Sequence, residues 1–316
     1  MGYPKKIQIG FQEGTCPLKC KKCFAFGENA TKIKKVQKMP LKKALQLIDR
    51  IATFKNIPSI QPSIYTEPFA NEDLREIIVF CNNKKVPINI ITNGILLNEE
   101  WMNLLIKYLN DDSTISFSLD AVSQDVYEKV RGDYRLEELE KKIEYLMSNR
   151  GSNGLRISVN FVYEEENYSE KDAFLEKWRN SVDAVRISAA IDSNRKVPII
   201  YRKDDIIKKC DVCPYLCETM TIDAGGEVRT CPFDAFGESY LGNVFEEDIL
   251  DIWNGKAMMD LRQKHRENGL KPEDFCFGCE GGYGIYNFSQ IEETEDSILK
   301  ISDYAVYYNR KTNNIF

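Results

Sequence analysis

The stretch GTCPLKCKKC, residues 14–23, is the most informative part of the chain, because it places three cysteines at the spacing C-x3-C-x2-C. A closed structural zinc site needs four ligands, and the only histidine, His265, is far away in the sequence. Three thiolates are instead typical of a 4Fe-4S cluster whose remaining iron is open to a substrate or cofactor. Three unrelated thiols in a reducing compartment are the simpler alternative.

The composition limits the classes of function. The 316 residues are 43% hydrophobic and 29% charged, enough for one large domain or for one large and one small domain. The net charge of −6 argues against general nucleic-acid binding. The start MGYPKKIQIG has no apolar signal region, and no run of about 18 apolar residues is present to cross a membrane. Ten cysteines without a secretion signal indicate metal or redox chemistry in a reducing, cytoplasmic location.

Strand-like and helix-like segments alternate along the first part of the chain. We expect strands at residues 6–11, 59–65, 87–92, 114–119, 155–163 and 184–188, with helical segments between them. Such alternation predicts parallel strands joined by crossover helices. Six units are too few for a closed eight-stranded barrel. The sequence therefore predicts an α/β fold with a partial (β/α)6 TIM-like barrel, whose chemistry lies at the C-terminal ends of the strands.

With its three cysteines directly after the first expected strand, the stretch resembles the signature of radical SAM enzymes. In that family the open iron of a 4Fe-4S cluster chelates the amino and carboxylate groups of S-adenosylmethionine. The resemblance implies that Cys16, Cys20 and Cys23 hold this cluster. Many family members have an aromatic residue before the third cysteine, where this chain has Lys22. That position mostly offers its backbone to the adenine, so we expect the change to matter little.

Two strand ends resemble family contacts to the cofactor's methionyl part. Tyr65-Thr66-Glu67-Pro68 stands where the family has Gly-Gly-Glu-Pro, and the Glu67 carboxylate suits the ammonium group of the cofactor. Arg131, on the helix after the fourth strand, suits the cofactor carboxylate. An ordinary exposed acid is the alternative for Glu67, and a surface ion pair is the alternative for Arg131.

Three further residues resemble contacts to the ribose and the cofactor carboxylate. Ser118 and Asp120 lie on one face of the fourth expected strand, because side chains alternate along a strand. A polar row of this kind is costly inside a barrel unless it meets a polar ligand. Asn160 interrupts the apolar fifth strand and resembles a ribose contact.

A second group of cysteines follows the polar residues 192–209. A hairpin is expected over residues 219–230, around Ala224-Gly225-Gly226, and a helix with an interruption at Asn254-Gly255 is expected over about residues 246–266. The hairpin and a closing C-x2-C loop together offer four thiols. The residues alone allow either zinc or a 4Fe-4S cluster here.

Residues 213–279 resemble the twitch form of the SPASM extension of radical SAM enzymes, which holds one auxiliary 4Fe-4S cluster. The stretches LGN at residues 241–243 and IWN at residues 252–254 also match that extension. The resemblance implies the ligands Cys213, Cys231, Cys276 and Cys279, although Cys210 or Cys217 could replace Cys213. It divides the chain into a barrel at residues 1–195, a β-hairpin-plus-helix iron–sulfur extension at residues 196–282 and a C-terminal tail at residues 283–316.

The resemblance leaves three functions open. The favoured one is an epimerase that converts L- to D-residues in a ribosomally made precursor peptide: a 5′-deoxyadenosyl radical removes the Cα hydrogen, and Cys217, outside the ligand set, donates a hydrogen to the opposite face. The second is a dehydrogenase whose auxiliary cluster accepts an electron, as in twitch-bearing dehydrogenases of aminocyclitol antibiotics and in sulfatase-maturing enzymes. The third is a non-catalytic metal-binding module. Flavodoxin or ferredoxin is the expected reductant.

Overall fold

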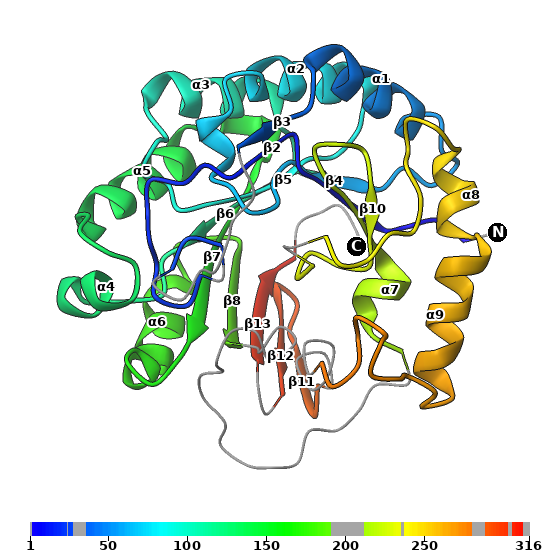
Figure 1. The fold of residues 1–316 in the computed structure, drawn as a ribbon. Coiled ribbons are helices and arrows are strands. Elements are labelled where there is room, and N and C mark those ends of the chain that lie inside the picture. Colours follow the sequence, from blue (N-terminus) through cyan, green and yellow to red (C-terminus); the bar gives the residue numbers. More distant parts are fainter. Residues whose placement is uncertain are drawn as a thin grey trace.

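The computed structural model describes residues 2–23, 25–27, 36–190, 212–234, 237–279, 288–302 and 305–311. Within these ranges, the barrel wall consists of six parallel strands, β1 (Lys6–Ile9), β4 (Ser59–Gln61), β5 (Asn89–Thr92), β6 (Thr114–Ser118), β7 (Arg156–Tyr163) and β8 (Ala184–Ala189). The outer layer in Figure 1 contains α1 (Leu41–Ile51), α2 (Leu74–Lys84), α3 (Glu99–Tyr108), α4 (Gln124–Val130), α5 (Leu136–Asn149) and α6 (Lys171–Trp178). The predicted partial barrel is confirmed.

The helices form where apolar residues recur at helical spacing. In α1 the buried side chains are Ala44, Leu47, Ile48 and Ile51, which form one stripe along the helix. Strand residues such as Ile7, Ile60 and Ile115 belong to the same apolar core. Since side chains alternate along a strand, the intervening residues face the barrel interior. Several of these are polar: Gln8, Gln61, Ser116 and Ser158.

The extension continues the barrel wall beyond β1. Strand β9 (Thr219–Ile222) pairs parallel with β1, and β10 (Val228–Arg229) pairs antiparallel with β9. The short helix α7 (Pro214–Glu218) leads directly into β9, and α8 (Ile249–Trp253) and α9 (Lys256–Arg266) follow the hairpin. The expected interruption at Asn254-Gly255 separates these last two helices.

The C-terminal segment extends the opposite edge of the wall. The strands β11 (Gln290–Glu293), β12 (Ser297–Ile301) and β13 (Ala305–Arg310) form an antiparallel meander, and β13 pairs with β8. Residues expected to form a tail therefore cover an otherwise open strand edge, which would expose unpaired backbone groups. Figure 1 shows β13 beside β8 and the extension strands on the other side of the interior. The predicted domain boundaries near residues 195 and 282 fall outside the described residues.

A short ribbon lies over the end of the barrel. Strand β2 (Gln12–Glu13) pairs antiparallel with β3 (Gln37–Lys38), so the chain after β1 runs across the C-terminal ends of the strands. Helices that are both long and apolar enough for a membrane span are absent from the described part of the chain.

Candidate active site at the strand ends

The three-cysteine loop lies between β2 and β3. Cys20 is buried, and Cys16 and Cys23 are half-buried. The Cys23 amide donates to the Cys20 carbonyl at 2.9 Å, and the Gly27 amide donates to the Cys23 carbonyl at 2.7 Å. A Cβ at Gly27 would stand 2.5 Å from the Cys23 carbonyl oxygen, so only glycine fits where the loop closes.

The thiols of this loop are close enough to affect one another. Burial, with smaller contributions from Glu67 and from the nearby Cys20 and Cys23, raises the pKa of Cys16 to about 11, although the Leu18 amide acts in the opposite direction. As thiolates they need positive charge between them, which an iron–sulfur cluster supplies. No three His, Cys, Asp or Glu side chains in the described ranges converge tightly enough for a single metal ion. Ligation of an iron–sulfur cluster by these cysteines stays a prediction.

The Glu67 carboxyl joins the loop after β4 to the end of β5. It is 2% exposed and accepts hydrogen bonds from Thr92 Oγ1 at 2.5 Å, the Asn93 amide at 2.9 Å and the Phe69 amide at 3.4 Å. The Glu67 amide donates to the Thr15 carbonyl at 2.7 Å. Glu67 is therefore a buried brace for the cysteine loop rather than an exposed acid. Its predicted contact with the cofactor ammonium stays a prediction.

The raised pKa of Glu67 should be visible in the pH dependence of stability. Burial raises its pKa to about 7, although the three donors act in the opposite direction. The folded state holds this proton more tightly than the unfolded state. The contribution of Glu67 to the free energy of unfolding is therefore complete below its usual pKa of 4.5 and is lost as the pH rises through about 7. We expect the difference between the Tm of wild type and the Tm of Glu67→Gln to decrease as the pH rises from 4.5 to about 7. A pH-independent difference between the two proteins would contradict the shift.

Tyr65 shows how the chain replaces the first glycine of the family motif. Its φ is 51°, a left-handed conformation that glycine adopts at little cost. The phenolic oxygen donates to the carbonyl of Pro232, next to Cys231 in the extension. The substitution therefore retains the glycine-like backbone and adds a side chain that connects the barrel loop with the second group of cysteines.

Asp120 is the centre of a buried charge network at the end of β6. Its Oδ2 lies 2.8 Å from Lys22 Nζ and 3.1 Å from Arg131 Nη1, and its Oδ1 accepts from the Val162 amide at 2.6 Å. Burial raises the pKa of Asp120, but the two cations outweigh this effect and leave the pKa lowered. Lys22 also donates to the Val162 carbonyl and lies 3.6 Å from Glu164. Asp120 thus holds the cysteine loop against β6 and β7.

Arg131 has hydrogen-bonding capacity left. Its Nε is buried and lacks a hydrogen-bond partner among the described residues, although the Arg131 side chain is close enough to the Tyr127 hydroxyl to lower the pKa of that group, which burial raises. Arg131 also lowers the pKa of Cys20, which burial raises. A buried guanidinium donor next to the cysteine loop fits the carboxylate of S-adenosylmethionine. The alternative expectation for Arg131, a surface ion pair, is wrong, because Arg131 is buried and pairs with Asp120.

Ser118 and Asn160 are neighbours on the barrel wall. They are in register on β6 and β7, so their side chains share the interior face. The Asn160 carbonyl accepts from the Leu119 amide at 3.1 Å and from the Asp120 amide at 3.3 Å, which positions the turn after β6. Their predicted contacts with the ribose stay a prediction.

The four predicted ligands of the extension come together. Burial raises the pKa of Cys231 well above its usual value, and Cys276, Cys213 and Cys279 raise it further. The Cys279 amide donates to the Cys276 carbonyl at 3.2 Å. Four thiols that disfavour one another's ionisation suit a shared cluster. Ligation by this set stays a prediction.

Cys217 lies apart from this group. Its side chain is exposed on α7, and its neighbour is Arg262 of α9. Burial lowers the pKa of Arg262, whereas the Cys217 sulfur acts in the opposite direction. Arg262 Nε donates to the Leu216 carbonyl at 2.8 Å. Cys210, the other alternative ligand, lies outside the described residues. Cys81, on α2, is fully buried.

Three positioning residues were missed by sequence reasoning. Lys22, expected to matter little, makes the contacts with Asp120, and an unusual charge beside the third cysteine was the available signal. Asn93, in the Thr-Asn-Gly turn that follows β5, donates from Nδ2 to Cys16 Sγ at 3.6 Å. Nothing in the sequence around Tyr65 indicates its contact with Pro232 of the extension.

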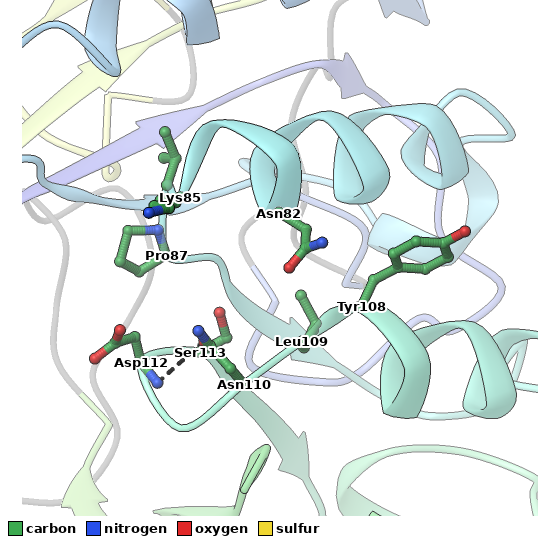
Figure 2. A pocket seen from close by; sticks show the side chains of 9 residues that line it. Asn82, Lys85, Pro87, Tyr108, Leu109, Asn110, Asp112 and Ser113 are labelled. Atoms are coloured by element: carbon green, nitrogen blue, oxygen red, sulfur yellow. Dashed lines mark hydrogen bonds between the residues drawn. The ribbon is translucent and has the colours of Figure 1, made fainter. Parts of the chain in front are cut away.

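A separate pocket lies at the opposite ends of the strands. It has a volume of about 330 Å³ and includes Asn82, Lys85, Tyr108 and Asp112 in its lining. Figure 2 shows these side chains where the chain enters β5 and β6. Since barrel chemistry belongs to the C-terminal strand ends, this pocket is not part of the candidate site.

Comparisons with known proteins agree with this geometry. Residues 14–177 match the model of the radical SAM superfamily, and residues 200–280 match the SPASM model, described as an iron-sulfur cluster-binding domain. An uncharacterized protein of Treponema pallidum (strain Nichols) is 25% identical over 79% of this chain and 71% of its own length. The antilisterial bacteriocin subtilosin biosynthesis protein AlbA of Bacillus subtilis (strain 168) is 24% identical over 67% of this chain, which spans 54% of that protein.

The fold also resembles a solved structure. Streptococcus suis SuiB bound to its precursor peptide SuiA matches with a TM-score of 0.64 and 18% identity, over 88% of this chain and 70% of SuiB. SuiB bound to S-adenosylmethionine matches with a TM-score of 0.63. At this identity the likeness establishes the fold alone.

Proposed function

The chain belongs to the radical SAM superfamily and carries a SPASM domain, and from this premise we propose that it epimerises a residue of a peptide from the L to the D form. When bound, the family's 4Fe-4S cluster and S-adenosylmethionine supply a carbon radical that removes an unreactive hydrogen atom. Cys16, Cys20 and Cys23 would hold that cluster, and Arg131, Ser118 and Asn160 would hold the cofactor beside the barrel interior.

A peptide substrate is supported by two of the similar proteins. AlbA takes part in the biosynthesis of a bacteriocin, and SuiB binds a precursor peptide. The polar interior of this barrel offers hydrogen-bonding groups suited to a peptide backbone, which carries a donor and an acceptor on nearly every residue.

The main support for epimerisation is that Cys217 lies apart from the other thiols of the extension. Among the described cysteines of this region, Cys217 is the exposed one, and it is not among the main causes that raise the pKa of Cys231 and of Cys276. It lies on α7, two residues before β9 enters the barrel wall. A thiol outside a ligand set keeps its S–H bond and is able to donate a hydrogen atom.

The proposed reaction balances with one thiol and one reductant. The peptide Cα loses a hydrogen atom from one face to the carbon radical that the cofactor would supply, and becomes planar. Cys217 gives its S–H hydrogen atom to the opposite face, which leaves a sulfur radical and a D-residue. One electron from a flavodoxin- or ferredoxin-like donor and one proton from solvent then restore the thiol.

Deuterium incorporation tests the role of Cys217. In deuterated water, reconstituted wild type should add one deuterium to Cα of a candidate precursor peptide, because the thiol exchanges its proton with solvent. Cys217→Ala should add none, whereas Cys81→Ala, which changes a buried cysteine on α2, should behave as wild type. Mass spectrometry and chiral amino-acid analysis measure the outcome. Unchanged deuteration by Cys217→Ala would refute the donor.

A dehydrogenase is the second candidate. The contact of Tyr65 with Pro232 connects the loop after β4 with Cys231, which favours passage of an electron between the two thiol groups. Cys217, beside Arg262, would then have no part in the chemistry. The substrate would lose one hydrogen atom, one electron and one proton, and the product would be two hydrogens lighter even with Cys217→Ala.

A further inference from the structure

The barrel interior has a polar wall that the proposed chemistry does not use. On β1, Gln8 is in register with Gln61 of β4 and with Thr221 of β9, and Lys6 is in register with Ser59 and Thr219. Residues in register on parallel strands project to the same face. Because Ile7 and Ile9 enter the apolar core, this polar set faces the interior. The wall is shared between the barrel and the extension, since β9 belongs to the latter.

Two polar atoms of this wall lack a partner among the residues that the structure describes. Gln8 is 8% exposed and Thr221 is 1% exposed. Gln8 Oε1 and Thr221 Oγ1 are buried without a hydrogen bond within the part of the chain that the structure describes. A buried polar group without a partner costs about 1–3 kcal/mol. Two such groups in register indicate that the wall is shaped for a polar ligand rather than for packing.

The charge of the interior indicates the sign of that ligand. No ion pair to Lys6 occurs among the described residues; Glu218, the nearby acid, pairs instead with Lys5 at 2.6 Å. Burial lowers the pKa of Lys6 and Arg186 lowers it further, while Glu218 acts in the opposite direction. Arg186 lies on β8, across the interior from β1, with its guanidinium over the Tyr307 ring at 5.2 Å. A half-buried ammonium without an ion pair among the described residues favours an anionic group beside it.

We propose that Lys6, Gln8 and Thr221 bind a carboxylate of the substrate peptide. The Lys6 ammonium and the Thr221 hydroxyl would donate to the carboxylate oxygens, and the Gln8 carbonyl oxygen would accept from a neighbouring peptide N–H. The assignment of the carboxylate to a peptide rests on the proposed function. The carboxylate belongs to a C-terminus or to an acidic side chain, and these two sources share the same chemistry.

The depth of the site has a consequence for the substrate. Lys6 begins β1 and Ile9 ends it, which corresponds to about 10 Å along a strand. The cysteine loop follows the Ile9 end. An extended peptide rises by about 3.3 Å per residue, so the modified residue should lie about three residues from the bound carboxylate.

Thermal unfolding with small probes tests the site without turnover. N-acetylglycine carries a carboxylate and an N–H like a C-terminus, N-acetylglutamic acid α-amide imitates an acidic side chain, and N-acetylglycinamide lacks the charge. At equal ionic strength, at least one of the two acids should raise the Tm of wild type by about 2 °C or more. The acid with the larger effect identifies the source of the carboxylate. The neutral amide should have no effect.

Two variants and a control complete the test. Thr221→Val removes an unsatisfied buried hydroxyl, and Lys6→Met removes an ammonium whose charged form burial disfavours. Each variant should therefore raise the Tm of the free protein and abolish or weaken the response to the acids. Lys5→Met, next to Lys6 but exposed, should keep the response. A lower Tm for both Lys6→Met and Thr221→Val, or equal responses to acid and amide, would overturn the proposal. These results need no catalysis, so they are independent of whether the enzyme epimerises its substrate.

Discussion

Replacing Asp120 with asparagine should lower the free energy of unfolding by about 3–5 kcal/mol, because it leaves two buried cations without their counter-ion. Lys22 and Arg131 both pair with the Asp120 carboxylate, whose exposure is 1%. Asparagine isolates this charge effect. It tolerates the φ of 59° at this position, and its side-chain oxygen is able to accept the Val162 amide as the carboxylate does.

Urea denaturation of the protein without bound metal measures this loss. Glu137→Gln is the matched control, because its ion pair with Lys141 is exposed and should leave stability unchanged. Adding Lys22→Met to Asp120→Asn should recover part of the loss, since one unpaired cation is removed. Additive effects of Lys22→Met and Asp120→Asn would mean that the ion pair does not hold the cysteine loop.

Iron content should separate the second group of thiols from the remaining cysteines. Cys231→Ala should lose about four of about eight irons, because Cys231 is a buried member of the predicted ligand set and the other three thiols raise its pKa. Cleavage of S-adenosylmethionine should persist, because the first cysteine loop is unchanged. Iron analysis and electron paramagnetic resonance of the reconstituted protein measure both clusters.

Two other cysteines serve as controls. Cys81→Ala should retain all iron, because Cys81 is packed in α2. Cys217→Ala should also retain all iron, because Cys217 is exposed and apart from the four thiols. Loss of four irons with Cys217→Ala but not with Cys213→Ala would instead make Cys217 a ligand and remove it as a hydrogen donor.

The residue pattern predicted the barrel strands well because local periodicity reports which face of each element is buried. The expected strand at residues 114–119 corresponds to β6, Thr114–Ser118. The expected strand at residues 59–65 ends earlier, at Gln61, because the chain turns there and Tyr65 adopts a positive φ. A bend of this kind depends on contacts with Thr15 and Pro232, which are distant in sequence.

The cysteine spacing and the alternation of strands and helices were enough to predict the radical SAM fold and a second cysteine-bearing segment. Only the tertiary structure decided that β9 and β13 extend opposite edges of the barrel wall, that Lys22 pairs with Asp120, and that Cys217 lies apart from the four thiols. The physical reason is the distance along the chain over which each kind of signal acts. Periodicity and motif spacing act within one element or loop, whereas strand pairing and buried charge pairing join residues whose separation along the chain carries no signal of their contact.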